Sequence, residues 1–183
     1  MPMIDFGSRI VMLTAAVVLC SGALSPAGAV TDTAFRYSTP QTGYLMLGPA
    51  DFQPERSGLQ YAKNGGTSIY TTADGEACFH APLRLPRQTT FERVTVFYSR
   101  AADAAVVTSV LQINAEGTNY DFLANPSLSL APVTVRGKIS YAGIASTSVI
   151  NNRLYNYSVR LCLTKNAAFY NARIEYTYTN AGD

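Results

Sequence analysis

Few side chains in this sequence could carry acid–base or nucleophilic chemistry. His80 is the single histidine, so a histidine-based general base would have to use it. It lies two residues from Cys78, and on a strand this spacing places both side chains on one face. A Cys–His nucleophile pair is therefore geometrically conceivable. The alternative, which we adopt, is that Cys78 is oxidised and His80 is a surface residue without a catalytic role.

Asp74 and Glu76 are the only close acidic pair, and glycoside hydrolysis uses two carboxylates. The dipeptide Asp74-Gly75 is typical of a solvated turn, which argues against a catalytic pair. A calcium loop would need more oxygen ligands at regular spacing. Gly65-Gly66 lacks the lysine and the helix of a phosphate-binding loop. The sequence thus indicates no catalytic residue, metal or cofactor.

The start of the chain has the pattern of a secretory signal peptide. Arg9 precedes an apolar run over residues 10–19, and Ala27-Gly28-Ala29 forms a small-residue cleavage site. The run is about ten residues long, whereas crossing a bilayer takes roughly 20. We therefore expect a signal peptide over 1–29 and no membrane span. The alternative is a lipid anchor on Cys20, which is disfavoured because Leu19 stands where a small residue is required.

The remaining residues, 30–183, are about as many as one ordinary domain contains. Residues 30–42 are expected to form a loose N-terminal arm. The net charge is only +2, and the basic residues are spread singly, which argues against a nucleic-acid partner. Cys78 and Cys162 are the two cysteines left after processing, and in an exported protein such a pair predicts a disulfide. A metal site would need about four ligands, more than two thiols and one imidazole offer.

Apolar and polar residues alternate over 155–164 and 170–178, which is the period of half-buried strands. The first run places Tyr157, Val159 and Leu161 on one face, with Cys162 on the more polar face. Other expected strands cover residues 44–47, 67–72, 78–83, 91–100, 105–113, 120–123 and 133–140. Pro82 and Pro86 predict an edge or a connection over 81–87. We expect an all-β fold: a single antiparallel β-sandwich, jelly-roll-like, with one disulfide.

Four segments together resemble a group of exported bacterial β-sandwich proteins. They are Phe52-Gln53-Pro54, the run from Phe79 to Pro86 (FHAPLRLP), Val94-Thr95-Val96-Phe97-Tyr98, and Arg173-Ile174-Glu175-Tyr176-Thr177. In that group an F-x-A-P-V-x-L-P segment leads into a strand rich in aromatics. This sequence departs from the group where Arg87-Gln88-Thr89 replaces a glycine-containing turn. The resemblance implies the sandwich fold and carries over no catalytic residues.

The twelve tyrosines are the compositional feature most open to a functional interpretation, because exposed rings can stack on sugars or anchor partners. Alternation instead assigns Tyr155, Tyr157, Tyr176 and Tyr178 to the core. The favoured hypothesis is a non-catalytic secreted structural or binding module for an unknown extracellular ligand or protein partner. The alternatives are a carbohydrate-binding module using exposed tyrosines, or a secreted hydrolase using dispersed carboxylates or His80.

The first prediction concerns processing of the exported protein. Cleavage after Ala29 should leave Val30 as the N-terminal residue, which mass spectrometry of the exported material would detect. A mature chain that begins at a lipid-modified Cys20 would contradict this prediction.

Overall fold

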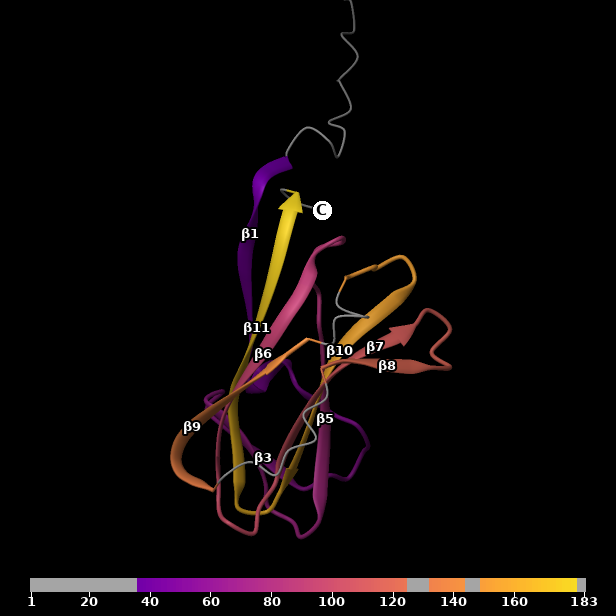
Figure 1. Cartoon of the computed structure of the whole chain (residues 1–183). Coiled ribbons are helices and arrows are strands. Elements are labelled where there is room, and N and C mark those ends of the chain that lie inside the picture. Colours follow the sequence, from indigo (N-terminus) through magenta and orange to yellow (C-terminus); the bar gives the residue numbers. More distant parts are fainter. Residues whose placement is uncertain (1–35, 125–131, 144–148, 181–183) are drawn as a thin grey trace, which may run out of the picture. The chain divides into compact units, whose positions relative to one another are not determined.

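The structure is a computed structural model that describes residues 36–124, 132–143 and 149–180, all within one compact unit, Asp32–Asp183. These residues form two antiparallel sheets (Figure 1). The first sheet has the order β3 (Tyr61–Asn64), β4 (Ser68–Thr71), β11 (Ala167–Asn180), β6 (Thr90–Arg100) and β9 (Val133–Ala142), with β1 (Arg36–Leu47) also paired to β11. The second has the order β2 (Gln53–Pro54), β5 (Glu76–Pro82), β10 (Tyr155–Thr164), β7 (Val106–Asn114) and β8 (Tyr120–Ala124). A single 3-10 turn, η1 (Pro49–Asp51), precedes β2.

The expected all-β sandwich with one disulfide is confirmed. Among the eight strands from β4 to β11, the pairs are nested: β4 with β11, β5 with β10, β6 with β9, and β7 with β8. Such nesting results when one long hairpin is rolled into two sheets, and we propose the jelly-roll class for it. No helix in the described part of the chain is long and apolar enough to cross a membrane.

Strand alternation turns one face of each sheet into a shared core. The second sheet contributes Phe79 and Leu161, and the first sheet contributes Ile174, all fully buried. The rings of Phe52 and Phe169 meet edge to face with centroids 4.9 Å apart. Each large apolar side chain buried in this way contributes roughly 1.5–3 kcal/mol to the free energy of folding.

A β-bulge in β11 corrects one sequence expectation. Strict alternation placed Tyr170 on the core face with Ala172 and Ile174. Tyr170 is an extra residue between two positions that pair with neighbouring residues of β6, and a bulge of this kind shifts the alternation by one. Phe169 therefore takes the core position. The ring of Tyr170 instead lies 4.4 Å from the guanidinium carbon of Arg136.

One expected segment boundary differs from the structure, and another agrees with it. Residues 36–42 of the expected loose arm belong to β1, in which Gln41 and Thr42 pair with β11; residues 30–35, like the predicted signal over 1–29 and Cys20, lie outside the described residues. The expected edge or connection over 81–87 agrees with the structure, because Ala81 and Pro82, the last residues of β5, pair with β10 but lie beyond the pairing with β2. After Pro82 the chain has no strand until Thr90, as two prolines without amide donors favour.

The predicted Cys78–Cys162 disulfide is present and joins β5 to β10. The two cysteines are direct cross-strand partners with Cα atoms 4.1 Å apart. Both lie on the outer face of the sheet, as alternation indicated, but they are not open to solvent: Cys78 is 7% and Cys162 is 2% exposed. The side chain of Arg160 covers the bridge, with its Nη2 3.3 Å from Cys78 Sγ.

The second prediction is that this disulfide stabilises the fold. It closes a loop with a sequence separation of 84, and such bridges typically contribute about 2–4 kcal/mol. A Cys78→Ala, Cys162→Ala double variant should therefore melt roughly 5–15 °C lower, at about 2–4 °C per kcal/mol. Thermal unfolding followed by circular dichroism measures the shift, and an unchanged melting temperature would contradict the prediction.

Candidate functional site

A pocket of about 410 Å³ lies on the outer face of the second sheet. Its lining residues come from the loop after β2 and from β5, β10, β7, β8 and the β7–β8 turn: Glu55, His80, Leu111, Ile113, Gly117, Thr118, Asn119, Tyr120, Phe122 and Arg160. Because β5 and β10 turn Phe79 and Leu161 into the core, the intervening positions must face outward. The pocket is thus a direct consequence of the alternation that builds the core.

One side of the pocket is charged. His80 and Arg160 are cross-strand partners, and the carboxylate of Glu55 bridges them. Arg160 Nε donates to Glu55 Oε1 at 2.5 Å, and Arg160 Nη2 lies 3.4 Å from Glu55 Oε2. His80 Nε2 is 2.7 Å from Glu55 Oε1. The hydrogen bond from Arg160, assisted by its charge and by His80, lowers the pKa of Glu55 although partial burial opposes the shift. Glu55 is therefore an ionised, oriented acceptor.

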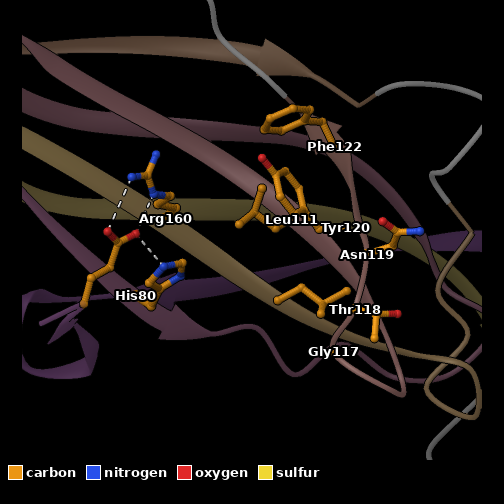
Figure 2. Close-up of a pocket in the computed structure, with 10 residues that line it drawn as sticks. His80, Leu111, Gly117, Thr118, Asn119, Tyr120, Phe122 and Arg160 are labelled. Carbon is orange, nitrogen blue, oxygen red and sulfur yellow. Dashed lines mark hydrogen bonds and ion pairs between the residues drawn. The ribbon is translucent and has the colours of Figure 1, made fainter.

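The other side of the pocket is apolar and aromatic (Figure 2). Leu111 and Ile113 of β7 pair with Phe122 and Tyr120 of β8. The Tyr120 ring packs edge to face on Phe122 with centroids 5.7 Å apart. Tyr120 is nevertheless 62% exposed, so much of its ring remains free for contact with a ligand.

The β7–β8 turn fixes the rim beside Tyr120. Asn114 Oδ1 accepts hydrogen bonds from the backbone amides of Thr118 and Asn119, at 2.9 and 3.1 Å. Asn114 Nδ2 also donates to Thr118 Oγ1 at 2.9 Å. Gly117 has a φ of +70°, which residues with a Cβ rarely adopt. One asparagine therefore holds both polar residues at the rim of the pocket.

The structure places the candidate residues from the sequence in different roles. His80 lies in the pocket, with a side chain 38% exposed, but Cys78 on the same strand is oxidised, so this Cys–His pair has no free thiol to act as a nucleophile. Glu76 and the two cysteines have ligand atoms within 4.8 Å of one another. A disulfide leaves no thiolates to bind a metal ion there.

The acidic pair of the sequence is solvated, as its turn position indicated. The side chain of Asp74 is 91% exposed and pairs with Lys165 at 3.0 Å. Glu76 is also exposed. Neither residue lines the pocket of Tyr120.

Three pocket residues were missed by sequence reasoning. Glu55 reaches the site only because β2 pairs with β5, opposite His80, and no local pattern signals that contact. Arg160 stands on the polar side of an alternating run, which placed it on an outer face without identifying a partner. Tyr120 carries a weak signal, because it opens a short strand between two polar residues, Asn119 and Asp121.

In comparisons with known proteins, the chain is similar only to solved structures. No family model and no curated protein matches the chain. A structure of infectious bursal disease virus (Gx strain) aligns with a TM-score of 0.43 and 8% identity, over 78% of this chain and 32% of that chain. The Clostridium thermocellum endo-1,4-beta-D-xylanase 10B, with its CBM22-1 and GH10 modules and bound xylohexaose, aligns with a TM-score of 0.41 and 13% identity. The alignment covers 72% of this chain and 26% of that chain. A family 29 carbohydrate-binding module from Piromyces equi aligns with a TM-score of 0.37 and 7% identity, over 76% of this chain and 89% of that chain. Similarities this low carry no inference about function.

The third prediction follows from the lowered pKa of Glu55. A carboxylate whose pKa is lowered by folding stabilises the folded state at pH values above its ordinary pKa of 4.5, and this stabilisation is lost as the pH falls through the lowered value. Glu55→Gln should therefore reduce stability at pH 7, by up to about 1 kcal/mol for a solvated ion pair. The two proteins should converge in strongly acidic buffer.

Denaturant unfolding at several pH values measures this difference, and Asp103→Asn, at an exposed acid in the β6–β7 connection, is the matched control. A difference between Glu55→Gln and the parent protein that is the same at pH 7 and pH 3 would show that the ion pair does not act through the charge of Glu55.

Proposed function

We propose that this chain is a non-catalytic binding module whose ligand is a carbohydrate, held in the pocket of Tyr120 on the second sheet. The observation that carries the proposal is the exposed ring of Tyr120 facing an ordered set of hydrogen-bonding groups across the same pocket. The sequence hypothesis was a structural or binding module of unknown ligand, and a carbohydrate-binding module using exposed tyrosines was one alternative to it.

A sugar ring suits both sides of this pocket. Its faces carry C–H groups, which stack on aromatic rings such as that of Tyr120. Its rim carries hydroxyls, each able to donate and to accept a hydrogen bond. The carboxylate of Glu55 accepts such bonds, and Arg160, part of whose side chain is exposed, donates them. Small-molecule sites generally combine apolar contact area with a few placed polar groups.

Hydrolysis of the ligand is less well supported. Glycosidases commonly need two carboxylates across the scissile bond, and Glu55 is the one carboxylate among the described residues that line this pocket. Its pKa is lowered, whereas a general acid needs a raised one. His80 contacts Glu55, but these lining residues include no serine or cysteine that could serve as its nucleophile.

We place the module outside the cytoplasm. Disulfides persist in oxidising compartments and are rare in the cytosol, and the Cys78–Cys162 bridge supports this placement. The proposed signal peptide over 1–29 is the corresponding export route.

The fourth prediction tests Tyr120 as the stacking ring. Tyr120→Ala should lower the affinity for every oligosaccharide that the parent protein binds, by roughly tenfold or more. This loss is equivalent to about 1.4 kcal/mol and is expected because the stacking surface is removed. Tyr120→Phe keeps the ring and should retain most of the affinity. Isothermal titration calorimetry against neutral and acidic oligosaccharides provides the measurement.

Tyr44→Ala is the matched control, since Tyr44 is 58% exposed but lies on β1 of the first sheet. It should bind as the parent protein does. If Tyr120→Ala and the parent protein have equal affinity for every sugar that the parent protein binds, the pocket is not the binding site.

A further inference from the structure

The pocket of Tyr120 does not end at its charged side. A second cavity of about 190 Å³ is lined by Glu55, Arg56, Leu59, Glu76, Cys78 and Arg160. Glu55 and Arg160 line the first cavity as well, so the pair forms a boundary that both cavities share. We call these the aromatic cavity and the central cavity.

A third cavity, of about 290 Å³, adjoins the central cavity. It lies between the loop after β2 and the β4–β5 turn, and we call it the distal cavity. Arg56, Leu59 and Glu76 line both it and the central cavity. Each cavity therefore shares side chains with the next.

The aromatic cavity crosses the strands of the second sheet, because its lining residues lie on β8, β7, β10 and β5, which follows the observed strand order. The central and distal cavities then follow β5 through Cys78 and Glu76 toward the β4–β5 turn. Neighbouring strands lie about 4.8 Å apart, so the path from β8 to β5 alone spans roughly 14 Å. A single sugar ring would occupy only part of that length.

We propose that the three cavities form one continuous groove that binds a linear, neutral oligosaccharide chain, which crosses the strands at the aromatic cavity and then follows β5. The inference rests on the proposed carbohydrate function and specifies its ligand class. Successive sugar units would occupy the aromatic, central and distal cavities.

The charges along the groove favour a neutral chain. Three carboxylates line it, those of Glu55, Glu76 and Asp74. Glu55 pairs with Arg160 and Asp74 pairs with Lys165, and Arg56 lines the same cavities as Glu76. The described lining residues therefore carry no excess of positive charge that would attract an acidic chain. Carboxylates accept hydrogen bonds from hydroxyls but repel the carboxylates of an acidic sugar chain.

The floor of the central cavity is rigid. Cys78 lines it, and its disulfide fixes β5 against β10 at that point. Arg160 lies over the bridge, 3.3 Å from Cys78 Sγ, and its bond to Glu55 holds the loop after β2 in place. A groove that is ordered before binding loses less conformational entropy when the chain is bound.

The fifth prediction concerns ligand length and uses neutral β-linked gluco-, xylo- and manno-oligosaccharides, from a single sugar to about six units, in calorimetric titrations. The affinity of the parent protein for the best of these series should rise by roughly tenfold or more from the shortest to the longest chain, since each added unit contacts another cavity. An acidic series of the same lengths, oligogalacturonate, should bind more weakly at low salt.

Two variants separate the ends of the groove. Arg56→Ala combined with Glu76→Gln changes the distal and central cavities, and should weaken binding of long chains severalfold while short chains bind as before. Tyr120→Ala should weaken both. Asp103→Asn, outside the groove, is the control, and melting temperatures confirm that each variant is folded.

The outcomes distinguish the groove from the underlying function. Binding that depends on Tyr120 but neither increases with chain length nor responds to the distal variant would reject the groove and leave the carbohydrate function standing. Stronger binding of the acidic series would reject the neutral ligand class. Binding of no oligosaccharide of any length would reject both proposals.

Discussion

The pairing of β5 with β10 is the constraint on which the rest of the molecule depends. On its inner side this pair turns Phe79 and Leu161 into the core, where both are fully buried. On its outer side it carries the Cys78–Cys162 bridge. A shift of one residue in this register would exchange the two sides, and with them both the core and the outer face that carries the pocket of Tyr120.

Stability and site geometry are therefore linked through the same strands. Arg160 and His80 lie opposite each other because the register is fixed, and Glu55 joins them from a loop that begins beside β5. The amide of Glu55 also donates to the carbonyl of Cys78 at 3.0 Å, which extends the sheet by one backbone bond beyond β2. The loop that supplies the acidic side chain is thus anchored by the sheet that supplies its partners.

The fold was largely predictable from the sequence because its signals are local. Alternation over 155–164 identified β10, and two cysteines in a chain expected to be exported predicted the bridge. The site was less predictable, because its contacts are distant: Glu55 and Arg160 are separated by 105 positions. Alternation also failed at Tyr170, where one inserted residue in β11 moves a ring out of the core. A bulge depends on the partner strand, so a single strand's pattern does not contain it.

The contacts of Glu55 suit it to accept a hydrogen bond and not to donate a proton. A carboxylate in an open pocket would normally be free to rotate and to take up a proton near its ordinary pKa. Here Arg160 and His80 hold both oxygens in place and lower the pKa. The same contacts that make Glu55 a poor acid make it a well-oriented acceptor for a hydroxyl. A carboxylate held in this way can orient a polar ligand against the ring of Tyr120 while neither the carboxylate nor the ligand changes its protonation state.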